Sequence, residues 1–114
     1  KYKFNLIKEI SVKKEQDITL SYKYKNYCEY ILFDAKGNNE SMPGGNGVSF
    51  NWNLLKDKNF DFKWILSGGL NTRNVSKALK ITKAKYIDVS SGVEDDLGNK
   101  NKYLIRKFCN NALC

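Results

Sequence analysis

The stretch from Lys63 to Val75, KWILSGGLNTRNV, contains the unit on which the chain is built. Its apolar run passes directly into Ser-Gly-Gly, which is typical of a strand buried in a parallel sheet and ending in a loop. Asn71 or Thr72 is expected to cap a helix after that loop. One face of this helix would carry apolar residues at i, i+3 and i+4, namely Val75, Ala78 and Leu79.

Similar units occur along the whole sequence. Short apolar runs predict four strands, at Ile7 to Val12, Tyr30 to Ala35, Lys63 to Ser67 and Tyr86 to Val89. Two other helices are expected, at Asp17 to Cys28 with an apolar face of Leu20, Tyr24 and Tyr27, and in the last segment with a stripe of Leu104, Ile105, Phe108, Cys109 and Ala112. A short helix carrying Trp52 and Leu55 is expected at Asn51 to Lys56. Strands that alternate with helices predict an α/β fold with a parallel sheet, in one domain spanning residues 1–114.

Composition excludes several classes of function. The formal charge is +8, but Arg73 and Arg106 are the only arginines and the lysines are scattered, so no nucleic-acid partner is expected. No apolar run approaches the roughly 20 residues that cross a bilayer, so we expect no membrane partner and a cytoplasmic location. Three cysteines without CxxC spacing and the lack of histidine argue against a metal site. Neither a Walker loop nor a GxGxxG fingerprint is present, and no cofactor is expected.

Two segments suggest catalytic chemistry. Asp34 follows the second apolar run directly, which puts a carboxyl group at the ligand-binding end of a parallel sheet, where it could serve as a general acid. An aspartate that only caps the next element would occur at the same place. The segment MPGGNGV contains Gly44, Gly45 and Gly47, which suit a loop that closes over a ligand or a plain flexible connection.

Two further segments suggest an anion site. Gly68 and Gly69 follow the third strand, and Asp88 lies near the end of the fourth, before Ser91 and Gly92. Small residues at the ends of two successive strands leave backbone N–H groups available to an anion, and barrels commonly bind phosphate after strands seven and eight.

Together these motifs resemble phosphoribosylanthranilate isomerase. In family order they are IKEISV, ILFDAK, PGGNGVSFNWNLL, ILSGGLNTRNV, IDVSSGVE and the terminal G-x-K…I-R-x-F of Gly98 to Phe108. The resemblance covers nearly the whole chain and implies the C-terminal half of a (β/α)₈ TIM barrel, βα units five to eight, as a fragment of a longer chain. Asn46 stands where the family usually has Thr or Ser.

The resemblance implies an Amadori rearrangement in tryptophan biosynthesis, from N-(5′-phosphoribosyl)anthranilate to 1-(2-carboxyphenylamino)-1-deoxyribulose 5-phosphate. Asp34 matches the general acid and Asp88 the aspartate near the sugar hydroxyls. Gly44, Gly45 and Gly47 match the closing loop. The phosphate cradle is matched by Gly68, Gly69, Ser91 and Gly92.

The family's general base, a cysteine, belongs to the first half of the barrel, and Cys28, Cys109 and Cys114 are not at an equivalent strand end. The N-terminal half-barrel is therefore an expected partner, and the chain alone is expected to be inactive and either oligomeric or only partly ordered. A non-catalytic phosphate-binding half-barrel, or half of another phosphate-binding barrel such as indole-3-glycerol-phosphate synthase, remains an alternative.

Overall fold

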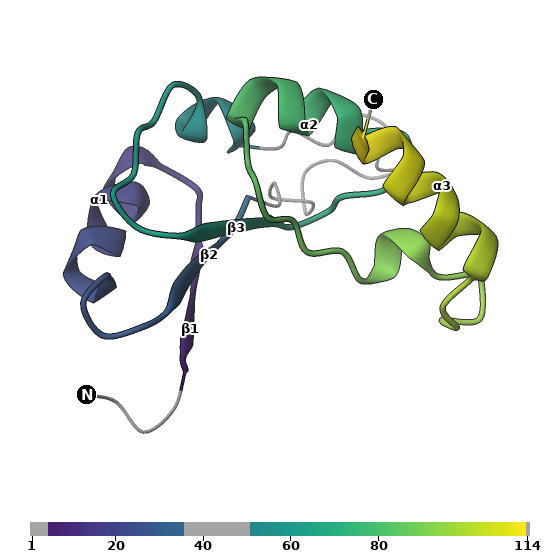
Figure 1. Ribbon diagram of the computed structural model, residues 1–114, viewed down its shortest axis with the longest axis horizontal. Coiled ribbons are helices and arrows are strands. Elements are labelled where there is room, and N and C mark those ends of the chain that lie inside the picture. The colour runs from purple at the N-terminus through teal and green to yellow at the C-terminus, as the bar shows by residue number, and fades with distance from the viewer. Residues whose placement is uncertain (1–4, 36–50, 114) are drawn as a thin grey trace.

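The structure is a computed structural model that describes residues 5–35 and 51–113. Strands and helices alternate along these residues (Figure 1). In chain order they are β1 (Ile7–Ser11), α1 (Glu15–Tyr24), β2 (Tyr30–Asp34), the 3₁₀ helix η2 (Asn51–Leu55), β3 (Trp64–Ser67), α2 (Val75–Thr82), the 3₁₀ helix η3 (Ser91–Val93) and α3 (Lys102–Leu113). None of the helices in these two ranges is long and apolar enough to span a bilayer.

The sheet is parallel, with strand order β1-β2-β3. The four-stranded sheet expected from the sequence is corrected in one respect. The fourth segment forms a single parallel bridge, Leu66 to Ile87, instead of a strand. Two backbone hydrogen bonds of 2.8 Å hold it beside β3, from the Leu66 N–H to the Tyr86 carbonyl and from the Asp88 N–H to the Leu66 carbonyl. The chain then turns at Ser90 into η3, which ends the pairing.

The two faces of the sheet differ in burial. Along β2, Ile31 and Phe33 are fully buried, whereas Leu32 and Asp34 are only half-buried. Successive side chains of a strand point to opposite faces, so one face belongs to the core and the other does not. The strand register extends this alternation across the sheet. We call the second surface the open face, and its strand residues are Ile7, Glu9, Ser11, Tyr30, Leu32, Asp34, Ile65 and Ser67.

The core lies between the sheet and the helices. Its buried apolar residues come from both layers, including Ile18 of α1, Leu55 of η2 and Val75 of α2. Phe33 is the centre of an aromatic cluster, with ring centroids 5.2 Å from Phe60 and 5.7 Å from Trp64. Figure 1 shows α2 above β3 and α3 beside α2. Trp52 and Leu55 are both buried, and the short helix predicted around them is confirmed as η2.

Helix α1 differs from the expected helix in its boundaries and in its buried face. It buries Ile18 and Ser21, whereas Leu20 and Tyr27, expected on the apolar face, are exposed. Ser21 is fully buried, and its hydroxyl donates to the Ile18 carbonyl, so its burial leaves the hydroxyl paired. At the start of the helix, the Asp17 carboxylate accepts two backbone N–H groups, from Lys13 at 2.8 Å and Lys14 at 3.0 Å.

Helix α3 divides its apolar residues between two faces. Phe108 is buried, and Leu104 and Ala112 pack partly against the core at i−4 and i+4 from it. The single stripe predicted from the sequence is therefore wrong for Ile105 and Cys109, which are exposed. With Leu113 they form a second row at i, i+4 and i+8, which we call the outer α3 stripe.

Candidate functional site at the carboxyl edge of the sheet

The carboxyl ends of the strands bring two carboxylates to one edge. Asp34 ends β2 and is in register with Ser67 at the end of β3. Ser67 in turn donates a hydrogen bond of 2.9 Å from its Oγ to Oδ2 of Asp88. Adjacent strands lie about 4.8 Å apart, so the backbones of Asp34 and Asp88 are about 10 Å from one another. A small polar ligand at this edge could therefore lie between two carboxyl groups. One of them could donate a proton to the ligand, and the other could accept hydrogen bonds from its hydroxyl groups.

The two aspartates differ in their surroundings. Asp34 is half-buried on the open face, and its backbone carbonyl accepts the Val12 N–H at 2.8 Å, which anchors the end of β2 between its neighbours. Asp88 is exposed, and the Ser67 hydroxyl fixes the direction of its carboxylate. The sequence predicted both aspartates at this edge. The Ser67 hydroxyl that orients one of them was not predicted.

The loop after β3 has a conformation that its glycines permit. Gly68 has φ 100° and Gly69 has φ 70°, in the left-handed region where a Cβ would be strained. The amide Nδ2 of Asn74 donates to the Gly69 carbonyl at 2.9 Å. Oδ1 of Asn74 accepts the Asn71 N–H at 2.8 Å, and Oδ1 of Asn71 accepts the Asn74 N–H at 3.0 Å.

The helix does not begin at residue 71 or 72 as predicted, because these two asparagines hold the chain in another conformation. The segment from Asn71 to Asn74 forms a hydrogen-bonded turn, and α2 begins only at Val75. Asn side chains compete for nearby backbone groups, which delays the helix by one turn. The only signal in the sequence was the pair of asparagines spaced three apart after the glycines.

A second loop is in contact with the first. A Cβ on Gly92 would lie 1.9 Å from the Leu70 carbonyl oxygen, so only glycine allows this approach. Val93, the next residue, is buried in the core. The two loops that contain Gly68, Gly69, Ser91 and Gly92 therefore lie side by side, next to Asp88.

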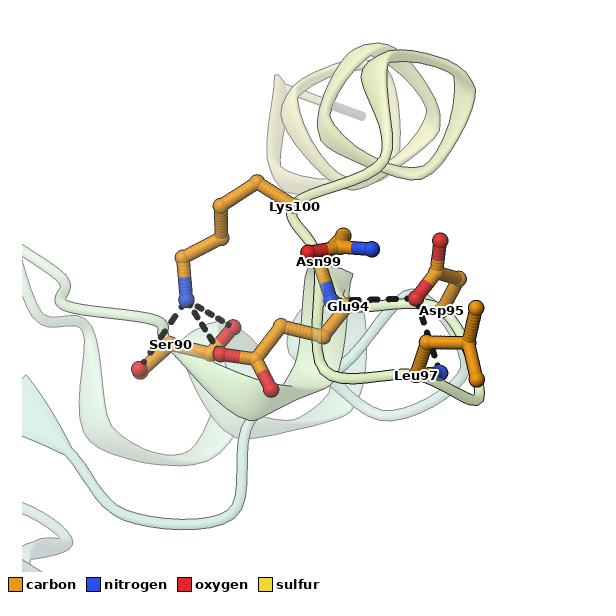
Figure 2. A network of polar contacts seen from close by, with 6 residues as sticks. All are labelled: Ser90, Glu94, Asp95, Leu97, Asn99 and Lys100. Carbon is orange, nitrogen blue, oxygen red and sulfur yellow. Dashed lines mark hydrogen bonds and ion pairs between the residues drawn. The ribbon is translucent and has the colours of Figure 1, made fainter.

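A polar network supports the second loop (Figure 2). Lys100 Nζ donates to both the carbonyl and the hydroxyl of Ser90, each at 3.2 Å, and pairs with the Glu94 carboxylate. Beyond it, Oδ1 of Asp95 accepts the N–H groups of Leu97 at 2.9 Å and Asn99 at 3.0 Å. Lys100 was noted in the sequence only as part of a terminal motif, and no role was predicted for it.

Other predicted residues are not brought to this edge. Gly44, Gly45 and Gly47 lie outside the described residues. Cys28 is half-buried before β2, at the opposite end of that strand from Asp34, and burial raises the pKa of its thiol. Cys109 is exposed on α3. Within residues 5–35 and 51–113, no three His, Cys, Asp or Glu side chains are grouped as metal ligands.

A cavity of about 620 Å³ lies at the other end of the sheet. Its lining includes Lys63 and Trp64 where β3 begins, and Lys83 just after α2. The length of β3 separates this cavity from Ser67 and Asp88. It therefore takes no part in the candidate site.

Comparisons with known proteins point to one enzyme family. The model of the N-(5′-phosphoribosyl)anthranilate isomerase family matches residues 1–111. The isomerase of Rhodospirillum centenum is 41% identical over 105 residues, which are 90% of this chain and 49% of that protein. The crystal structure of the Thermotoga maritima isomerase superposes with a TM-score of 0.78 at 35% identity, covering 97% of this chain and 52% of that one.

A further solved structure contains a bound ligand. It is a phosphoribosylanthranilate isomerase in complex with reduced 1-(o-carboxyphenylamino)-1-deoxyribulose 5-phosphate, with a TM-score of 0.71 at 31% identity over 96% of this chain and 48% of that one. The chain thus spans about half the length of the relatives that it matches. With the family model matching nearly every residue, this chain belongs to the N-(5′-phosphoribosyl)anthranilate isomerase family.

Proposed function

We propose that this chain is the second half of an isomerase barrel and supplies the general acid and the phosphate site for an Amadori rearrangement. The reaction is an aldose–ketose isomerisation that converts N-(5′-phosphoribosyl)anthranilate to 1-(2-carboxyphenylamino)-1-deoxyribulose 5-phosphate. Family membership supports this proposal, and so does the ligand of the related solved structure, a reduced analogue of that product. The observation that carries it is the meeting of Asp34, Asp88 and the two glycine loops at one edge of the sheet.

Asp34 is assigned the role of general acid. It would protonate the ribose ring oxygen as the ring opens, which requires a carboxyl group directed at the substrate. Its position at the carboxyl end of β2, half-buried and on the open face, suits this role. Asp88 would accept hydrogen bonds from the sugar hydroxyls, with its carboxylate held in direction by Ser67.

The phosphate is assigned to the paired glycine loops. Four residues would supply backbone N–H groups to it, namely Gly68, Gly69, Ser91 and Gly92. Neither Ser91 nor Gly92 donates its N–H to another described residue, so both groups are available to an anion. The contact between Gly92 and Leu70 keeps the two loops at one distance, as a shared phosphate requires.

The reaction also needs a general base, which we assign to a first half-barrel. In the described residues no thiol lies at the carboxyl edge, since Cys28 precedes β2 and Cys109 is on α3. The open face exposes Ile7, and the outer α3 stripe exposes Ile105 and Leu113, which supports a partner that covers both. Without such a partner we expect the chain to be inactive, and oligomeric or partly ordered.

Isomerase turnover on mixing tests this function. The chain is assayed alone and with a first half-barrel of the family, following the loss of substrate fluorescence. Turnover is expected only in the mixture, and Asp34→Asn should lower it about 10²- to 10⁴-fold. Asp61→Asn is the matched control, because Asp61 is exposed and pairs with Lys25 away from the site. Equal activity of the Asp34 and Asp61 variants would refute the role of Asp34.

The second candidate is a half-barrel that binds phosphorylated ligands without catalysis. The lack of a thiol at the carboxyl edge of the described residues favours it. Phosphate binding by the chain in a mixture that shows no turnover would select this function over the first.

A further inference from the structure

Lys100 is the residue of this edge to which the reaction assigns no role. Its Nζ donates to the Ser90 carbonyl and to the Ser90 hydroxyl, each at 3.2 Å, and pairs with Glu94 (Figure 2). Ser90 immediately precedes the loop of Ser91 and Gly92. A lysine ammonium has three protons to donate, and these three acceptors use all of them. The side chain is therefore held in one place, close to the loop but directed at its first carbonyl.

The geometry of the peptide bond transmits this contact to the loop. The Ser90–Ser91 peptide is trans, so the Ser90 carbonyl and the Ser91 N–H point in opposite directions. The Ser90 carbonyl accepts both the Lys100 ammonium and the Val93 N–H, the latter at 3.3 Å. Holding that carbonyl toward Lys100 directs the Ser91 N–H to the other side of the peptide, away from the lysine.

Lys100 is itself fixed by a hairpin. It forms an antiparallel bridge with Glu94, and the Asp95 N–H donates to the Asn99 carbonyl at 2.8 Å. Gly98 turns the chain with φ 85°. After the hairpin, the Asn101 N–H donates to the carbonyl of Val93, a buried residue, at 2.8 Å. The lysine is thus anchored to the same backbone that it orients.

We propose that Lys100 is a positioning residue for the phosphate loop. It holds the Ser90 carbonyl so that the N–H group of Ser91 faces the substrate phosphate. Glu94 balances the charge of Lys100, so the lysine acts through the loop and not by direct attraction of the anion. This inference rests on the proposed function, because it assigns the phosphate to this loop.

The test measures binding of inorganic phosphate by the chain in complex with a first half-barrel. Lys100→Met should weaken binding about tenfold, the scale of one lost hydrogen bond to a charged group. Lys102→Met is the matched control, because it removes the same charge from an exposed lysine two residues away. The control should change binding less than twofold. Equal affinities of the two variants would overturn the proposal.

Two further measurements, one at high salt and one on Glu94→Ala, distinguish a positioning role of Lys100 from a direct effect of its charge. At 1 M salt the Debye length is about 3 Å, so a through-space effect of the Lys100 charge would largely vanish. The ratio of wild-type to Lys100→Met affinities should instead stay about tenfold. Glu94→Ala leaves the lysine charge unbalanced but loosens its anchor, and we expect weaker phosphate binding. Tighter binding by Glu94→Ala, or a ratio that falls to one in high salt, would show that Lys100 acts by charge.

Turnover distinguishes this inference from the proposed function. In the active mixture, Lys100→Met should raise KM about tenfold and leave kcat nearly unchanged, because the phosphate is remote from the reacting bonds. A mixture that binds phosphate through Lys100 but does not turn over would leave this inference standing and refute the isomerase. Turnover with a KM unaffected by Lys100→Met would refute this inference and leave the isomerase function standing.

Discussion

Replacing Gly92 by alanine tests the contact that joins the two loops. The added Cβ would lie 1.9 Å from the Leu70 carbonyl oxygen, 2.9 Å from the Leu70 carbonyl carbon and 3.0 Å from Cα of Asn71. A carbon normally stays about 3.3 Å from a carbonyl oxygen. The loops must therefore move apart by about 1.4 Å, and all three neighbours are backbone atoms that cannot change rotamer.

The cost of that movement can be estimated from overpacked sites. Inserting a methyl group into a filled space costs about 1–3 kcal/mol. Alanine stabilises by about 0.4–1 kcal/mol through the unfolded chain, which offsets part of this cost. We expect a net loss of about 1–2 kcal/mol, which lowers Tm by about 2–8 °C in a complex with a first half-barrel. A shift of this size between the N–H groups that we propose to bind phosphate should also weaken phosphate binding by at least about tenfold.

Unfolding in urea and phosphate titration, both on the chain in complex with a first half-barrel, measure the two effects. Gly98→Ala is the control, because a Cβ there meets nothing within 4 Å and the only cost is the φ of 85°. It should lose about 1–2 kcal/mol of stability from backbone strain and keep its phosphate affinity. If Gly92→Ala matched the wild type in stability and in phosphate affinity, the loop contact would be refuted.

Other predictions concern the core, acid stability and the thiols. Phe33→Ala should cost about 3–5 kcal/mol in urea unfolding, because the ring is fully buried among aromatic neighbours; a loss below 1 kcal/mol would contradict its central place. Two backbone N–H groups lower the pKa of Asp17, so its stabilisation is complete above an ordinary carboxyl pKa of about 3.9 and is lost as pH falls through the lowered value. Asp17→Asn should cost about 0.5–1 kcal/mol at pH 7 and progressively less as the pH falls, measured by thermal unfolding. Burial raises the pKa of Cys28, so iodoacetamide at pH 8 should label Cys109 before Cys28. Tandem mass spectrometry of tryptic peptides, which distinguishes Cys109 from Cys114 on their shared peptide, measures the order, and labelling of Cys28 before Cys109 would contradict the prediction.

Most of the sheet could be predicted because its strands are short runs of branched and aromatic residues that end in small or acidic ones. Three strands were confirmed within one residue at each end. The fourth run reads the same way, but a strand also requires pairing over several residues, and only Ile87 forms a bridge. Pairing is a property of the neighbours in space, which the run itself does not contain.

The helix faces were harder to predict, because burial depends on what lies opposite each side chain. Ser21 is fully buried in α1, whereas the larger Leu20 of the same helix and Tyr27 after it are exposed. In the site, the position of Asp34 follows from strand direction alone. The contacts of Ser67 and Lys100 depend on side-chain directions at loops, and no spacing in the sequence predicts those.

The alternation along β2 has a consequence for how such a protein can change over generations. Ile31 and Phe33 are buried in the core, whereas Leu32 and Asp34, which alternate with them along the strand, lie on the open face, where we propose that the ligand binds. Successive residues of the strand lie on opposite faces of the sheet, so a substitution on the open face need not disturb packing in the core. New ligand preferences can therefore arise at even-numbered positions of this strand while its odd-numbered positions keep the same hydrophobic anchor.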